Sequence, residues 1–201
     1  MDKRSWLAGA AVACSSVLLG HSARAATIGD GILAELNFAR TRPAEYARVL
    51  EREVASARSA ASGFADEDPY ALEEAVDFLR SQQPLPPLRS NPGLVAAAVD
   101  HAQAQGQTGG FGHLGPDGAP LSERLHRHGV WAGLAAEDIS YGYRTPRDVV
   151  RQLIVDSGVP NRGHRNNIFG PAYQLAGVGC GRHSQYGAMC VIDFAGAMVR
   201  R

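Results

Sequence analysis

Residues 156–168 read DSGVPNRGHRNNI and place a carboxylate, a histidine, arginines and asparagines within one short segment. Thr145 and Pro146 mark the start of a preceding helix, on which Leu153 and Asp156 fall on one apolar face. Asp156 therefore points along the buried side at the helix end, where a carboxylate is costly unless another group pairs with it. Because binding groups gather on loops held by a rigid frame, we expect residues 156–168 to be a loop that carries a site.

Two other short stretches offer the same kind of chemistry. Gly112-His113-Leu114-Gly115 lies in a glycine-rich loop, and Ala136-Glu137-Asp138-Ile139 lies in a short strand candidate. They add a second histidine and a second carboxylate to those of the first segment. The sequence therefore predicts a constellation of two histidines and two acids, made of His113, His164, Glu137 and Asp156.

The remaining elements follow from apolar periodicity and from helix-start signals. Residues 51–68 lack a sustained apolar stripe, so we expect a frayed helix end and an exposed loop there. Helices come first and a terminal hairpin last, which favours an α+β fold over a doubly wound parallel sheet. Helices are predicted at 27–40, from 43 onward, from 69, at 92–106 and at 120–128, and a hairpin at 174–181 and 188–195.

The first 25 residues are typical of a secretory signal peptide, with a basic start, an apolar run and the cleavage pattern Ala23-Arg24-Ala25. An alternative is a lipoprotein signal, which would leave the chain anchored at Cys14. Both interpretations predict export, either to the periplasm or outside the cell. No second apolar stretch approaches the roughly 18 residues that a membrane span needs. Residues 26–201 are long enough for one domain with a sizeable core.

The net charge limits the expected binding partners, and the cysteine positions predict a disulfide. Without residues 1–25, Lys+Arg falls from 20 to 17 and Asp+Glu from 20 to 19, leaving a net charge of −2. Nucleic acid is therefore not an expected partner, because its binders carry a basic excess. Cys180 and Cys190 flank a predicted hairpin turn in an exported chain, so we expect them to form a disulfide.

Other polar side chains near these segments have expected partners. Arg162 and Arg165 could pair with Asp156 and Glu137, or could receive an anionic ligand. Asn166 and Asn167 are expected to hold the loop through hydrogen bonds to its backbone. The helical face that carries His101 turns inward, which favours a buried histidine bonded to a backbone carbonyl. His183 falls at the hairpin tip, where we expect it to be solvated.

Six motifs follow one another along the chain. They are Leu94-x-x-x-Ala98-x-x-His101-Ala102, Gly112-His113, Ala136-Glu137-Asp138-Ile139, Gly163-His164-Arg165-x-Asn167-Ile168, Gly177-Val178-Gly179-Cys180 and the closing run of residues 190–195. Their order resembles that of the CAP superfamily, which comprises cysteine-rich secretory proteins, antigen 5 and plant pathogenesis-related proteins of the first class. The resemblance spans roughly residues 30–195. It implies a three-layer α-β-α sandwich with a largely antiparallel central sheet, formed by a single domain over residues 26–201.

The resemblance also implies a cleft lined by two histidines, His113 and His164, and by two acids, of which Glu137 is the first. The chain departs from the family at the second acid: Leu153 stands where a tryptophan is usual, and Asp156 where a glutamate is usual. Asp138 replaces the family's usual asparagine.

Two imidazoles beside an open position suit zinc or another divalent cation, and the carboxylates could either complete the ligand shell or orient the rings. We therefore expect an exported protein that binds an extracellular ligand, such as a lipid or a cell-wall component, without catalysis. One alternative is a metal-dependent hydrolase with Glu137 as general base. Others are an envelope scaffold protein, and a purely structural polar knot without metal.

Overall fold

A computed structural model describes residues 26–60 and 68–198. The predicted signal peptide, including the alternative lipid attachment at Cys14, lies outside the described residues.

A four-stranded sheet forms the centre of the fold. The strands are β1 (Arg89–Ser90), β2 (Ala135–Tyr141), β3 (Leu175–Gly181) and β4 (Met189–Ala195), and they lie in the order β1-β3-β4-β2. Strand β4 is antiparallel to both β2 and β3, whereas the short β1 runs parallel to β3. The sheet is therefore mixed but largely antiparallel, and the predicted α+β class is confirmed.

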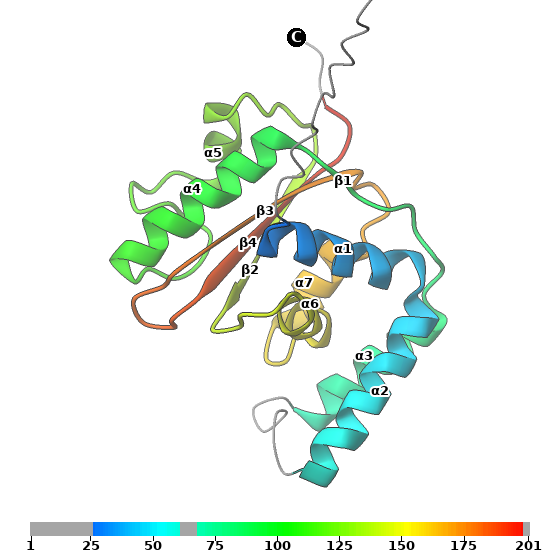
Figure 1. Cartoon of the computed structure of the whole chain (residues 1–201). Coiled ribbons are helices and arrows are strands. Elements are labelled where there is room, and N and C mark those ends of the chain that lie inside the picture. The colour runs from blue at the N-terminus through cyan, green and yellow to red at the C-terminus, as the bar shows by residue number, and fades with distance from the viewer. Residues whose placement is uncertain (1–25, 61–67, 199–201) are drawn as a thin grey trace, which may run out of the picture.

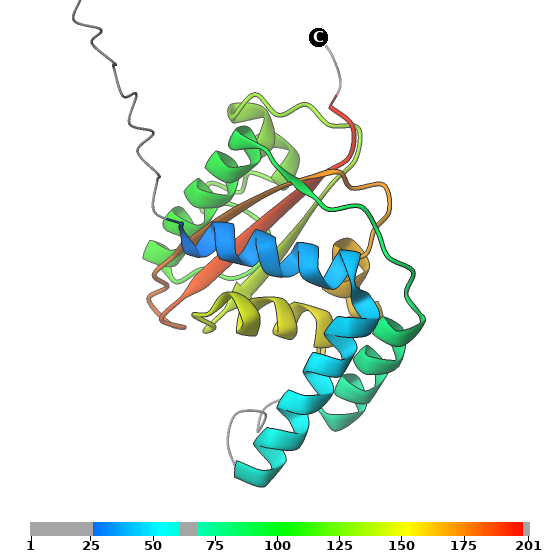
Figure 2. The same cartoon turned by 45° about the vertical axis from the view of Figure 1, so that its right-hand side comes forward.

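Helices cover both faces of this sheet and make three layers (Figures 1 and 2). Helix α4 (Pro92–Thr108) and the short α5 (Leu121–Arg127) lie on one face. Helices α1 (Ile28–Thr41), α6 (Pro146–Val155) and α7 (Gly163–Ile168) lie on the other, with a 3₁₀ turn at Pro160–Arg162 before α7. The edge strand β2 contacts helices of both layers, a position that matters for the site.

The pair α2 (Pro43–Ala60) and α3 (Pro69–Ser81) extends away from the sheet and packs against α1 and α6. Helix α2 continues to Ala60, so residues 51–60 are helical where a frayed end was expected, and residues 61–67 of the expected loop lie outside the described residues. The Asp68 side chain caps α3 by accepting the Tyr70 N–H, and Pro69 occupies the first helical position. Alanine and leucine side chains of α3 then form its buried face.

Two glycines let α4 approach β3 closely. A Cβ atom at Gly177 would overlap the backbone of Leu94, and one at Gly179 would overlap the backbone of Val99. The helix therefore packs directly on the strand backbone. This contact fixes the height of α4 above the sheet, and with it the position of every side chain between the two.

The predicted disulfide between Cys180 and Cys190 is confirmed. The two residues are directly paired across β3 and β4, so the bridge joins neighbouring strands just before the hairpin turn. Residues 156–168, in contrast, are not a loop throughout. The 3₁₀ turn and α7 occupy their second half, because Gly163–Ile168 adopts helical geometry against the end of α6.

Candidate functional site

His113 is held from the α4 side of the edge strand by Glu137. Its Nδ1 lies 2.9 Å from Glu137 Oε1, while Arg124 Nη2 donates to the other oxygen, Oε2, at 2.6 Å. The Glu137 and Arg124 side chains are almost fully buried, whereas the side chain of His113 is 56% exposed. Burial opposes ionisation, but the contacts with His113 and Arg124 outweigh it and lower the pKa of Glu137. Glu137 is thus a buried carboxylate that orients an exposed imidazole.

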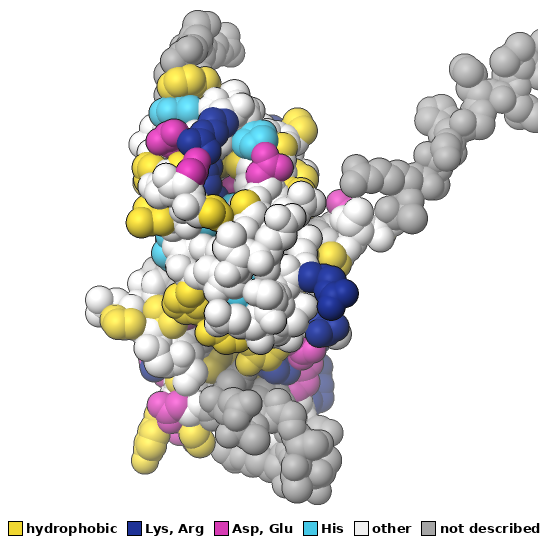
Figure 3. Space-filling view, turned by 90° about the vertical axis from the view of Figure 1, so that its left-hand side faces the viewer, with side chains coloured by type: hydrophobic (Ala, Val, Ile, Leu, Met, Phe, Trp, Pro, Cys, Tyr) yellow, Lys and Arg dark blue, Asp and Glu magenta, His cyan; other side chains and the backbone are white. Residues whose placement is uncertain are grey.

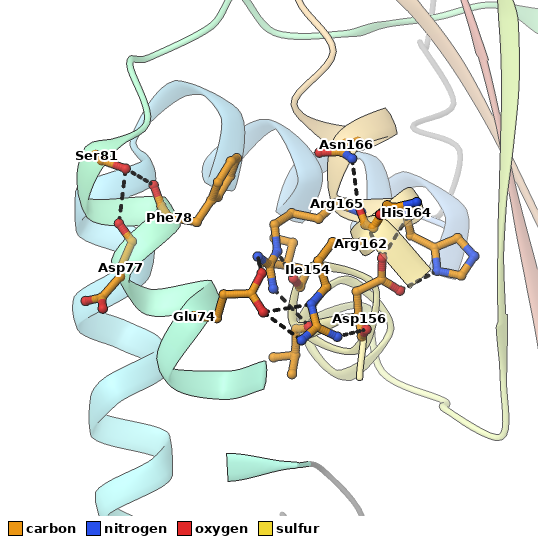
Figure 4. A network of polar contacts seen from close by, with 12 residues as sticks. Glu74, Asp77, Phe78, Ser81, Ile154, Asp156, Arg162, His164, Arg165 and Asn166 are labelled. Atoms are coloured by element: carbon orange, nitrogen blue, oxygen red, sulfur yellow. Dashed lines mark hydrogen bonds and ion pairs between the residues drawn. The ribbon is translucent and has the colours of Figure 1, made fainter. Parts of the chain in front are cut away.

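His164 is held in the same way on the α6 and α7 side. Its Nδ1 lies 2.6 Å from Asp156 Oδ1, and its backbone N–H donates to Oδ2 at 2.9 Å. Asp156 is completely buried, and a buried carboxylate is costly unless another group pairs with it. His164 is that partner. Figure 4 shows the Asp156 carboxylate facing the His164 ring.

The backbone between these two residues is strained. Asp156, Asn161 and Arg162 adopt positive φ angles of 56°, 56° and 52°, and they are the non-glycine residues that do so within the described part of the chain. Such conformations persist only where the surrounding structure over-determines them, and they cluster at functional sites. The strained turn carries the chain from Asp156 back to His164.

Two arginines tie this turn to α3 through Glu74, as Figure 4 shows. Arg162 donates to Glu74 Oε2 at 2.6 Å, and the nearly buried Arg165 donates to Oε1 at 2.9 Å. Arg165 also donates to the carbonyl oxygens of Ile154 and Val155 at the end of α6. The alternative in which these arginine side chains pair with the carboxylates of Asp156 and Glu137 is therefore wrong. On Asp156, the Arg162 side chain contacts the carbonyl oxygen, and Arg165 reaches the carboxylate through its backbone N–H. Arg124 occupies the position beside Glu137.

Two further acids are buried in the sheet. Asp138 accepts a 2.7 Å hydrogen bond from Asn167 Nδ2. The predicted hydrogen bond from Asn167 to the loop backbone is therefore wrong, because its side chain joins α7 to the Asp138 side chain on β2. Asn166 does bond to the backbone, at the carbonyl oxygen of Asn161. Asp193 pairs with Glu137 across β4 and β2 and is completely buried. Burial raises the pKa of both Asp138 and Asp193 well above the usual range.

Two histidines outside the pairs are buried. His101 on α4 is 2% exposed, and its Nε2 lies 3.4 Å from the Gly112 carbonyl oxygen, as expected of an inward-facing histidine. His183 is also 2% exposed, so the prediction of a solvated hairpin tip is wrong. The glycine-rich loop folds over the tip: His183 Nε2 donates to the Gly110 carbonyl oxygen at 2.8 Å, and Nδ1 accepts the N–H of Gln185.

The four predicted site residues form two hydrogen-bonded pairs, His113 with Glu137 and His164 with Asp156. Successive side chains of a strand point to opposite faces, so Glu137 faces α4 and α5 whereas Asp138 faces α7. Within residues 26–60 and 68–198, no group of three or more histidine, cysteine or acidic side chains is arranged to hold a metal ion. The carboxylates bond to Nδ1 of the rings, so their position suits orientation of the imidazoles better than direct ligation.

Sequence reasoning missed Arg124, Glu74 and Asp193. Arg124 lies on a helix of only seven residues with no motif around it, and Glu74 lies on a helix 88 positions before its partner Arg162. The sequence did give a signal for Asp193, because this residue shares one side of strand β4 with the apolar residues Met189 and Val191. A carboxylate in an apolar row indicates a buried acid with a special environment.

Residues 73–194 match the family described as CAP, the cysteine-rich secretory protein family. The match spans more than half of the chain and includes both histidine and acid pairs. The chain belongs to the CAP family. No curated protein matches its sequence significantly. Within the described residues of this CAP chain, no helix combines the length and apolar character that crossing a bilayer requires.

Solved structures of bacterial proteins show similarity to this CAP chain. One is an extracellular protein with an SCP domain from Bacillus anthracis str. Ames, 22% identical, with a TM-score of 0.48 over 56% of this chain and 35% of that one. An outer surface protein from Borrelia burgdorferi is 18% identical, with a TM-score of 0.48, covering 56% of this chain and 79% of that one. A cysteine-rich secretory protein from Staphylococcus aureus subsp. aureus Mu50 is 16% identical, with a TM-score of 0.42, covering 66% and 41%. The chain thus spans about a third of the length of the Bacillus protein.

Proposed function

We propose that this chain is an exported, non-catalytic binding protein in which His113 and His164 present imidazole nitrogens to a divalent cation such as zinc. The proposed cation site binds an extracellular ligand, either a lipid or a cell-wall component. The observation that carries the proposal is the shared arrangement of the two histidines. In each, Nδ1 is held by a carboxylate, and Nε2 has no hydrogen-bond partner among the described residues.

This arrangement matches the environment of metal-binding histidines, whose second ring nitrogen usually donates to a carboxylate. With the Nδ1 hydrogen directed at the carboxylate, a neutral ring keeps its Nε2 lone pair free. The strained turn that returns the chain from Asp156 to His164 also supports a site there. When bound, a zinc ion would supply a localised positive charge that attracts ligand oxygen atoms.

Two imidazoles alone are a minimal set of ligands, because structural zinc sites have four protein ligands and catalytic sites usually three. The remaining positions would be completed by water or by the ligand itself. A hydrolase is a weaker proposal for a geometric reason. Both oxygens of Glu137 already contact His113 or Arg124, and its side chain is only 2% exposed, so Glu137 is poorly placed to take a proton from a bound water molecule.

Export is part of the same proposal. It is supported by the signal-like pattern of residues 1–25 and by the family's description as secretory. Anchoring at Cys14 is the alternative form of export. Mass spectrometry of the mature N-terminus distinguishes a chain that begins near Ala26 from one that begins at a lipidated cysteine.

Isothermal titration of zinc into metal-stripped protein tests the cation site. We expect one ion per chain, with binding lost in His113→Ala and in His164→Ala. His126→Ala is the matched control, because that histidine stacks on Trp131 and belongs to neither pair. Full affinity in either site variant, or no binding by folded wild type, would overturn the proposed site.

Co-sedimentation with lipid vesicles and with insoluble peptidoglycan then tests the ligand, in the presence of zinc or of a chelator. We expect one of the two to retain the protein only with zinc. Retention that persists in both histidine variants would instead favour the scaffold hypothesis.

A further inference from the structure

A pocket lies on the α4 and α5 side, and neither His113 nor His164 lines it. It has a volume of about 310 Å³ and is bounded by α4, α5 and residues 115–117. Figure 3 views this side of the molecule and shows acidic, basic and histidine side chains lying together in its upper part. The pocket size falls at the lower end of the range for small-molecule sites.

The pocket has a polar rim. His128 Nε2 lies 2.8 Å from Asp100 Oδ2, and Arg127 Nη1 lies 2.8 Å from Asp117 Oδ2. The side chains of Asp100 and Asp117 are 66% and 52% exposed, so oxygen atoms of both remain accessible to hydroxyl donors.

The inner wall contains a buried arginine whose hydrogen-bonding capacity is only partly used. Arg124 is 6% exposed, and its Nη2 donates to Glu137 and to the His113 carbonyl oxygen. Its Nε and Nη1 have no partner among the described residues. A buried donor without an acceptor is costly, so these N–H groups call for an oxygen atom.

The same wall contains an unused acceptor, on His101. The carbonyl oxygen of Gly112 can only accept, so the ring nitrogen facing it, Nε2, carries the hydrogen. Nδ1 then holds a lone pair, and it has no partner among the described residues. Burial lowers the pKa of His101, which keeps the ring neutral and Nδ1 an acceptor.

A secondary amide complements this set of groups. Its carbonyl oxygen can accept from Arg124, and its N–H can donate to His101 Nδ1. A carboxylate would satisfy the arginine alone and would add negative charge near Glu137, Asp100 and Asp117. Alongside these groups, Ala97, Ala104 and Pro116 provide apolar surface that a methyl group can contact.

We propose that this pocket binds an acetamido group, with its amide between Arg124 and His101 and its methyl group against the alanines. The acetamido group would belong to an amino sugar, because the hydroxyl groups of a sugar can donate hydrogen bonds to the carboxylates of Asp100 and Asp117 at the rim. An N-acetylated peptide end offers the same acetamido group. The site needs no metal ion and is therefore independent of the proposed zinc site.

Nuclear magnetic resonance titration of the ¹⁵N-labelled mature protein in chelator tests this proposal. The probes are N-acetylglucosamine, N-acetylalanine amide, glucosamine and acetate. We expect N-acetylglucosamine to shift the amide signals of α4 and α5 and to bind at least about tenfold more tightly than glucosamine or acetate. The factor of ten corresponds to the loss of a well-made hydrogen bond.

The variant Ala104→Phe fills the pocket from an exposed helix position and should weaken binding about tenfold or more. Gln103→Phe is the matched control, because position 103 is exposed on the same helix but does not line the pocket. Tight binding of N-acetylglucosamine identifies an amino sugar as the source, and binding of N-acetylalanine amide alone identifies a peptide while still supporting the acetamido site. Equal binding of glucosamine or acetate, or full binding by Ala104→Phe, would overturn it. Chelator keeps this result separate from a failure of the zinc site.

Discussion

Replacing Arg124 by glutamine should lower the free energy of unfolding by about 3–5 kcal/mol at neutral pH. Arg124 Nη2 lies 2.6 Å from Glu137 Oε2, and the two side chains are only 7% and 2% exposed. Removing one partner of such a pair leaves an uncompensated buried charge, and the cost of that charge sets the magnitude. His113 still faces Glu137 in the variant, but its side chain is mostly exposed and compensates less.

The pH dependence identifies the cause of this loss. In the wild type the pKa of Glu137 is lowered, so its contribution to stability is present above the unfolded pKa and is lost as pH falls through the folded pKa. Without Arg124, burial dominates and the pKa of Glu137 rises. The cost of Arg124→Gln should therefore be largest at pH 7 and shrink towards pH 4, by up to about 1.4 kcal/mol per pH unit.

Urea denaturation followed by far-ultraviolet circular dichroism measures these free energies. The double variant Arg124→Gln with Glu137→Gln should be more stable at pH 7 than Arg124→Gln alone, because it removes the unpaired charge as well. A cost below about 1 kcal/mol, or one equal at pH 7 and pH 4, would refute the reasoning.

Two more predictions concern a buried acid and a glycine contact. Burial raises the pKa of Asp138, so the stability that its protonated form contributes is complete below the unfolded pKa and is lost as pH rises through the folded pKa. Asp138→Asn keeps the acceptor for Asn167, so relative to wild type it should gain stability with rising pH, up to about 1.4 kcal/mol per unit, and parallel curves would contradict this. Gly179→Ala should cost about 3 kcal/mol because its Cβ overlaps the α4 backbone, whereas Gly181→Ala, with ordinary contacts, should stay within about 1 kcal/mol in the same urea assay.

The elements that the sequence predicted well are those set by local pattern. Helix α6 ends at Val155 with Asp156 as its C-cap, and it has one apolar face, so the burial of this carboxylate followed from helical spacing. The disulfide followed from the position of Cys180 and Cys190 on either side of a turn, since hairpin geometry brings such residues together. The motifs also named two histidines and two acids without pairing them, and the structure places His113 beside Glu137 and His164 beside Asp156.

What escaped prediction depends on packing between distant segments. Arg165 meets Glu74 only because α3 packs against the end of α6, and no spacing within either segment encodes that contact. His183 is buried because the glycine-rich loop folds over the hairpin tip, and a turn prediction carries no information about such a cover. Ion-pair partners and burial of tips are therefore tertiary properties.

The distribution of protons among the buried acids gives the site its electrostatic character. Asp138 follows Glu137 on β2, and Asp193 pairs with Glu137 across β4; burial raises the pKa of both acids and so favours their neutral form. Arg124 and His113 hold the pKa of Glu137 down, so the negative charge of this cluster concentrates on one carboxylate. That carboxylate is the one that orients an exposed imidazole. Because neutral neighbours add no competing charge, the orientation of His113 depends chiefly on the single buried contact between Glu137 and Arg124.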